Sequence, residues 1–183
     1  MNSFKIDGRL CILFGFLLFL VPFPWFVAWI AAASFHEICH WLVVKLYGGN
    51  MRLFFAGIGG ASMQCNGLSN RAYLLAVLAG PVGGFVLVML GRWFPRLAIC
   101  SWLLSVYNLL PVLPLDGGQA MRLLLKSNTV FCVFEKITLI IISALAVSSC
   151  IVSNIGVLPL ILVASLWLKK RKRPCKDEVY AVQ

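Results

Sequence analysis

The sequence is poor in charged side chains, which make up only 12% of its 183 residues, and it has few acidic residues and only two histidines. Soluble domains carry roughly 25% charged and about 45–50% apolar residues, whereas this chain is 61% hydrophobic. With a mean hydropathy of +0.94, the composition excludes an ordinary soluble domain and predicts a membrane protein with several spans. None of the seven cysteines forms a C-x-x-C pair, which argues against a metal site built from paired thiolates.

Apolar runs divide the chain into about six expected transmembrane helices. The first run is too long for a hydrocarbon core of about 30 Å, and Pro22 and Pro24 break it into spans at about residues 10–22 and 25–47. Further spans are expected at about residues 72–91, 97–115, 130–150 and 152–168. The expected fold is therefore an all-α polytopic membrane protein that forms a single domain over residues 1–183.

A glycine-rich segment, residues 48–70, separates the second and third expected spans. It contains two short stretches, residues 51–56 and 61–65, with three glycines between them. This pattern predicts a small membrane-associated β-hairpin, whose exposed edge can hold an unwound peptide by β-addition. An ordinary glycine-rich connector is the alternative interpretation of the same composition.

Positive charge is concentrated on one side of the expected topology. The net charge is +10, and with the N-terminus inside, only Arg92 and Arg96 of the sixteen Lys and Arg residues fall outside. The bias predicts a multi-pass membrane protein with both termini in the cytoplasm. The basic cytoplasmic tail at residues 169–183 is expected to contact anionic lipid of the bilayer, and no nucleic-acid partner is expected.

The only two histidines, His36 and His40, lie four residues apart in the second expected span, together with Glu37. Residues four apart share one face of a helix, so both imidazoles can bind one metal ion. In this H-E-x-x-H pattern the glutamate orients and deprotonates a water that zinc acidifies. A carboxylate in mid-membrane costs about 2.5–3.5 kcal/mol on insertion scales, which favours a functional site over a chance pair of interfacial histidines.

A catalytic zinc usually has three protein ligands, and the chain has no third histidine. Cys39 is a poor candidate because it faces elsewhere on the helix. Glu135 lies beside Lys136, where an interfacial ion pair is the simpler interpretation. Asp116 lies at the end of the fourth expected span, which Pro111 and Pro114 are expected to break so that Asp116 turns inward. An Asp-Gly turn at the membrane surface is the alternative interpretation of Asp116. At this point the third ligand stays open.

A second motif, N-x-x-P-x-x-x-L-D-G, is present at Asn108, Pro111, Leu115, Asp116 and Gly117. Following H-E-x-x-H in an earlier span, it resembles the site-2 protease family of intramembrane zinc metalloproteases, peptidase family M50, over about residues 25–126. The resemblance implies that Zn²⁺ is held by His36, His40 and Asp116. It also implies that Glu37 is the catalytic base and that Asn108 positions the substrate or stabilises its oxyanion.

The compact size and the Leu-Pro-Leu-Asp-Gly-Gly sequence are similar to the family branch that contains the sporulation pro-sigma-factor protease. Two features depart from the family: Gly84 stands where Asn is usual in the third span, and no PDZ or CBS domain is expected. The resemblance implies a protein of the bacterial cell membrane that hydrolyses a membrane-anchored protein substrate, for example a pro-sigma or anti-sigma factor. It also implies regulatory membrane proteins as further partners.

Two other functions are the alternatives to proteolysis. A catalytically silent zinc-binding membrane scaffold of the same fold is disfavoured by the intact Glu37. A metal transporter needs more ligands along a path through the membrane, and Glu37 and Asp116 are the only carboxylates expected at depth.

Overall fold

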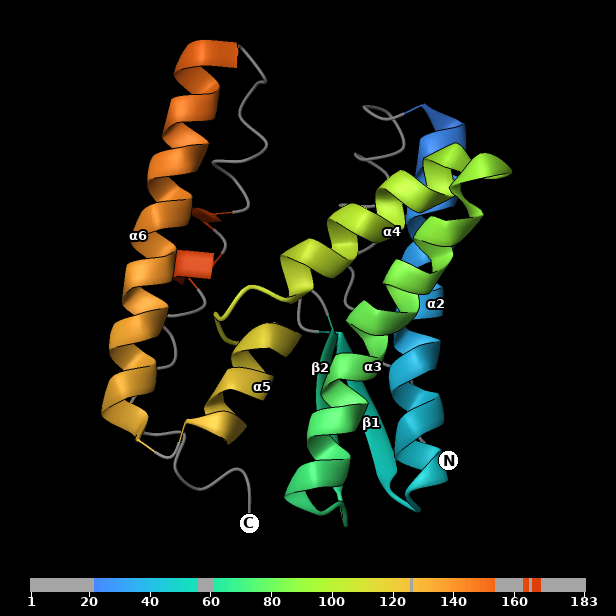
Figure 1. The fold of residues 1–183 in the computed structure, drawn as a ribbon, viewed down its shortest axis with the longest axis vertical. Helices are drawn as coiled ribbons and strands as arrows, with labels where there is room; N and C mark the ends of the chain where they lie inside the picture. The colour runs from blue at the N-terminus through green and yellow to red at the C-terminus, as the bar shows by residue number, and fades with distance from the viewer. Residues whose placement is uncertain (1–21, 56–60, 126, 154–162, 165, 169–183) are drawn as a thin grey trace. The chain divides into compact units, whose positions relative to one another are not determined.

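The computed structural model describes residues 22–55, 61–125, 127–153, 163–164 and 166–168. The chain divides between residues 109 and 110 into two compact units. The elements of the first unit are α2 (Phe23–Leu46), β1 (Asn50–Phe55), β2 (Ala61–Asn66), α3 (Asn70–Val88), the short 3-10 helix η1 (Met89–Arg92) and α4 (Pro95–Asn108). The elements of the second unit are α5 (Asp116–Leu124) and α6 (Asn128–Ser153) (Figure 1).

Three described helices are long and apolar enough to cross a membrane: α2, α3 continued by η1 to Arg92, and α6 over Asn128–Ser148. Their 24, 23 and 21 residues correspond to about 32–36 Å at 1.5 Å per residue, enough for a core of about 30 Å. Large apolar side chains such as Trp29, Ile38 and Ile140 are exposed on their outer faces, as suits contact with lipid. These helices match the second, third and fifth expected spans and indicate a membrane protein.

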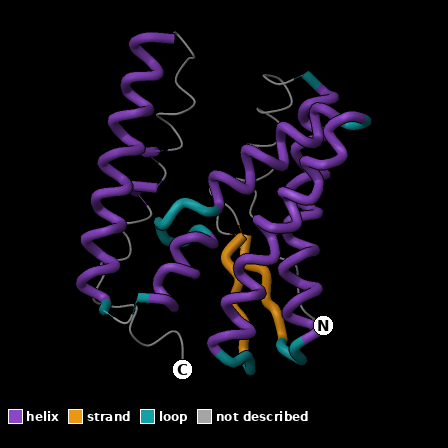
Figure 2. The backbone as a smooth tube through the Cα atoms, in the orientation of Figure 1, coloured by secondary structure: helices purple, strands orange, loops and turns teal. Residues whose placement is uncertain are grey.

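The fourth expected span, about residues 97–115, is shorter than the sequence predicts. Helix α4 ends at Asn108, and a loop over residues 109–115, teal in Figure 2, precedes α5. Pro111 and Pro114 lack the amide hydrogen that a helix needs, so the helix does not continue through them. The predicted break at the two prolines is confirmed, and Asp116 begins a new helix instead of ending the span.

The first expected span, most of the sixth and the basic tail at residues 169–183 lie outside the described residues. The number of six spans therefore stays a prediction. The same holds for the single domain over residues 1–183.

The two strands form an antiparallel pair, with Asn50 opposite Asn66 and Phe55 opposite Ala61 (Figure 2). They lie between α2 and α3 in the chain, in the segment for which the sequence predicts a hairpin. Gly48 and Gly67 flank the pair with φ of 73° and 84°, a backbone conformation that glycine adopts without strain. The sheet has two strands among the described residues, so each strand has one edge that the other strand does not cover.

Small side chains bring the helices of the first unit close together. The buried residues of α2 are Ala28, Ala32, His36, His40 and Val44. Those of α3 include Ala72, Ala76, Gly80 and Gly84. Because the residues in each set are four positions apart, each set lies along one stripe of its helix. Small residues at such contacts let two helix backbones approach closely. Helix α4 packs on both helices.

Gly84 lies where α3 meets α4. A Cβ at this position would overlap Ser105 Oγ and lie 3.4 Å from the Ser101 carbonyl oxygen. Gly84→Leu is therefore expected to lower the free energy of unfolding by about 1–3 kcal/mol through overpacking, measured as a lower unfolding temperature in detergent. Val82→Leu is the control, because Val82 is 59% exposed on the same helix. Equal unfolding temperatures for the two variants would contradict this packing.

Candidate metal centre

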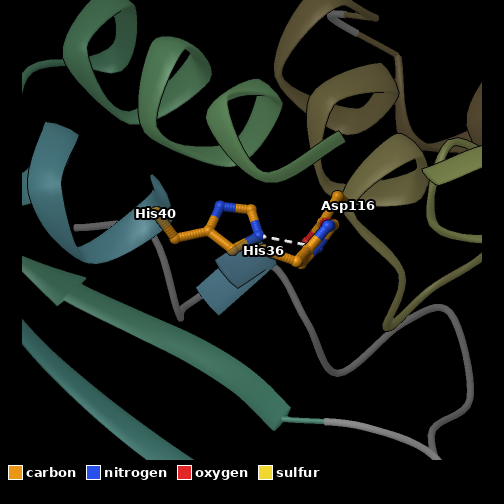
Figure 3. Close-up of side chains that lie close together, drawn as sticks. All are labelled: His36, His40 and Asp116. Atoms are coloured by element: carbon orange, nitrogen blue, oxygen red, sulfur yellow. Dashed lines mark hydrogen bonds between the residues drawn. The ribbon is translucent and has the colours of Figure 1, made fainter. Parts of the chain in front are cut away.

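The two histidines lie side by side on the buried stripe of α2. His36 is 3% exposed and His40 is 2% exposed. Their Nε2 atoms are 3.1 Å apart, joined by the dashed line in Figure 3, and the rings meet edge to face at a centroid distance of 4.7 Å. The prediction that both imidazoles share one face of the helix is confirmed.

A hydrogen bond to α3 orients the His40 ring. Its Nδ1 lies 2.7 Å from the backbone carbonyl oxygen of Ala76. A carbonyl oxygen only accepts, so Nδ1–H is the donor, and Nε2 of the neutral ring presents its lone pair. Metal-binding histidines are commonly held by such a bond from the nitrogen that does not bind the metal. Nε2 of His40 is thereby oriented as a ligand atom.

The space around the two Nε2 atoms fits a shared metal ion. Two nitrogens that each lie about 2.0–2.1 Å from one tetrahedral ion are roughly 3.3 Å apart, close to the 3.1 Å between these atoms. Gly80 of α3 leaves room beside them, since a Cβ there would overlap His40 Nε2 and lie 2.7 Å from His36 Nε2. The imidazole nitrogens, the distance between them and the space beside them all suit a divalent ion such as Zn²⁺.

Three other candidate residues belong to the first unit: Glu37 and Cys39 on α2, and Asn108 on α4. Glu37 follows His36 on α2 and is half-buried. Cys39 packs against Gly83, where a Cβ would overlap its sulfur, consistent with its rejection as a ligand. Asn108 is the last residue of α4 and is half-buried.

Asp116 belongs to the second unit, where it is the first residue of α5. It is 9% exposed, so it is not the exposed Asp-Gly turn that was the alternative interpretation. Like the two histidines, it is a buried residue that offers one ligand atom (Figure 3). Gly118, two residues further, packs beneath the preceding loop, where a Cβ would lie 2.5–2.7 Å from backbone atoms of Val112 and Leu113.

Glu135 is buried instead of paired at the surface with Lys136. It is 4% exposed, whereas Lys136 is exposed, because consecutive residues of a helix point in different directions. Its Oε1 accepts a hydrogen bond of 3.1 Å from the backbone N–H of Leu113. A carboxylate within an apolar span is the sequence signal that marks such a residue.

The described residues thus define a helical membrane protein in which apolar helices hold a buried histidine pair suited to a metal ion. Comparison with known proteins leads to the same class. The model of Peptidase family M50 matches residues 89–150. A zinc metalloprotease of Methanocaldococcus jannaschii is 26% identical over 118 residues, which are 56% of this chain and 34% of that protein. The chain spans about a third of the length of this curated relative.

The structure is also similar to the site-2 protease from Methanocaldococcus jannaschii. The TM-score is 0.62 at 20% sequence identity, and the match covers 94% of each chain. The chain therefore has the site-2 protease fold. The family model and the curated relative support the Peptidase M50 family that the two motifs predict, and the structural similarity supports the fold. The sporulation branch stays a prediction.

Gly80→Ala is expected to lower the affinity for Zn²⁺ by at least about tenfold, because the new Cβ would fill the space beside both Nε2 atoms. The measurement is a zinc titration of purified, metal-stripped protein against a chromophoric competitor. Val82→Ala, on the exposed side of the same helix, is the control and should keep the affinity of the unmodified protein. Unchanged affinity in Gly80→Ala would mean that the ion binds elsewhere.

Proposed function

We propose that this protein is an intramembrane zinc metalloendopeptidase that hydrolyses a peptide bond of a membrane-anchored protein within or near its transmembrane segment. The observation that carries the proposal is the pair of histidine Nε2 atoms, which lie 3.1 Å apart on the buried face of the apolar helix α2. Glu37 follows His36 directly in the chain. The site-2 protease fold and the description of the curated relative as a zinc metalloprotease support it.

The proposed zinc ligands are His36, His40 and Asp116. Two imidazoles and one carboxylate are a common ligand type for a catalytic zinc, and they leave one position for water or substrate. Asp116 is supported by its place in the second motif and by its burial, since buried carboxylates in an apolar span are commonly functional. A zinc ion bound there supplies Lewis-acid polarisation of the scissile carbonyl and of the attacking water.

Glu37 is the proposed general base. It takes a proton from the water whose oxygen bonds to the carbonyl carbon, and it delivers a proton to the amine nitrogen as the C–N bond breaks. Asn108 is proposed to donate its side-chain N–H to the carbonyl oxygen, where negative charge develops. The role of Glu37 is supported by its position next to His36, a proposed metal ligand. The role of Asn108 is supported by its position as the first residue of the second motif.

The hairpin is the proposed docking site for the unwound substrate. A transmembrane helix holds its carbonyl groups in its own hydrogen bonds, so the segment to be cleaved must first unwind. An open strand edge accepts such a segment by β-addition. This role is supported by the uncovered edge that each strand has among the described residues and by the place of the pair in the chain directly after α2, the helix that carries both histidines.

The cellular setting is proposed from the sequence. The positive-inside bias supports six spans with both termini in the cytoplasm, and the similarity to the sporulation branch supports a bacterial cell membrane. The similarity to the sporulation branch supports a pro-sigma or anti-sigma factor as the substrate class and regulatory membrane proteins as partners. No nucleic-acid partner is proposed.

Glu37→Gln is expected to reduce cleavage at least about a hundredfold, because the general base is lost while the ligands remain. The measurement is mass spectrometry of products formed from a membrane-anchored substrate in proteoliposomes, with zinc content and unfolding temperature recorded in parallel. Ile38→Val, at a 56% exposed position next to it, is the matched control. Full cleavage by Glu37→Gln would exclude the mechanism. A zinc-loaded protein that cleaves no such substrate would favour the silent scaffold.

Asp116→Ala is expected to weaken zinc binding by about tenfold or more, as His36→Ala should, because each removes one of three ligands. Competition titrations of the purified variants measure the effect. Leu124→Ala, at a 64% exposed position of the same short helix, should bind zinc normally. If Asp116→Ala bound zinc as tightly as the unmodified protein, the third ligand would be another residue.

A further inference from the structure

Glu135 is a carboxylate on the buried face of an apolar helix. It lies on one stripe of α6 with Phe131 and Leu139, and these three residues are 4%, 3% and 0% exposed. Within Asn128–Ser148, the candidate membrane span of α6, the only charged residues are Glu135 and Lys136. An apolar side chain would suit this stripe better, since a carboxylate in an apolar span is costly and marks a function by default.

The carboxylate holds the loop that leads to α5. Two backbone N–H groups of this loop have partners within it: Val112 donates to the Leu110 carbonyl at 2.8 Å and Leu115 donates to the Val112 carbonyl at 2.9 Å. The N–H of Leu113 instead donates to Glu135 Oε1 at 3.1 Å. The prolines at 111 and 114 prevent the helical hydrogen bonds that would otherwise order this segment, and the bond to Glu135 ties it to α6.

The same loop is also held from the α5 side. Gln119 Nε2 donates to the Pro114 carbonyl oxygen at 3.0 Å. Gly118 lets the first turn of α5 approach the loop, because a Cβ there would lie 2.6 Å from the Val112 carbonyl oxygen. The loop is thus fixed from two helices directly before Asp116, and a shift at Leu113 would move the start of α5.

We infer that Glu135 is a positioning residue for the metal centre, which holds the Leu113 N–H and thereby sets the place of Asp116. The inference rests on the proposed function, because it takes Asp116 as the third zinc ligand. The hydrogen bond needs an oxygen acceptor at the reach of a glutamate side chain, and it does not need the negative charge. Residues that hydrogen-bond a metal ligand directly typically change metal affinity by about 10–100-fold, and Glu135 acts one step further out, through the loop that precedes Asp116.

Three substitutions separate the acceptor from the charge. Glu135→Gln keeps an oxygen at the same reach without the charge, Glu135→Asp keeps the charge but is one methylene shorter, and Glu135→Leu keeps neither. Zinc affinity of the purified full chain is measured by competition, together with the unfolding temperature of the metal-free form. Glu135→Gln is expected to bind zinc within about threefold of the unmodified protein, and the other two about tenfold or more weakly. Lys136→Gln, at the exposed neighbour, is the control and should bind zinc normally.

The inference is overturned if Glu135→Asp binds zinc normally while Glu135→Gln does not. Zinc affinity would then depend on the negative charge of the side chain and not on its length. It is also overturned if all three variants bind zinc as the unmodified protein does. If Glu135→Leu does not fold, the comparison of the Gln and Asp variants decides. Failure of the proposed function gives a different result. The unmodified protein would then bind no zinc, or His36→Ala would bind zinc as tightly as the unmodified protein, and the inference about Glu135 would be overturned as well.

Discussion

The close packing of α3 on the histidine face of α2 is the contact on which the metal centre depends. The Ala76 carbonyl accepts the His40 Nδ1–H at 2.7 Å, and Gly80 leaves space beside both Nε2 atoms. In an apolar interior, water does not satisfy backbone and imidazole groups, so they must find protein partners. One helix contact therefore sets the protonated nitrogen, the ring orientation and the space for an ion together.

Sequence spacing predicts the part of the centre that lies on one helix. Residues four apart share a face, so the pairing of His36 with His40 follows from their spacing, and the lengths of α2, α3 and α6 follow from apolar runs. Spacing does not show what lies opposite that face. The contact of Gly80 with both imidazoles depends on the register of α3 against α2, so the sequence indicates only that small residues permit close packing.

The errors in the sequence interpretation have two physical causes. The break at Pro111 and Pro114 is predicted, but hydropathy places the end of the fourth span at about residue 115, whereas α4 ends at Asn108, because backbone hydrogen bonding outweighs apolar composition. Glu135 is assigned to Lys136 because the two are adjacent in the chain, yet adjacent helix residues point apart. One partner of Glu135, the N–H of Leu113, is 22 residues away, and a pairing at that distance follows from tertiary structure alone.

The central claim is that the histidine pair binds a zinc ion, with a carboxylate oxygen as the third protein ligand. X-ray absorption at the zinc edge of the loaded protein tests this most directly, because it reports ligand type and distance. The predicted result is a first shell of nitrogen and oxygen at about 2.0–2.2 Å with outer-shell scattering from two imidazoles. A sulfur shell at about 2.3 Å, or a spectrum without imidazole scattering, would contradict the account.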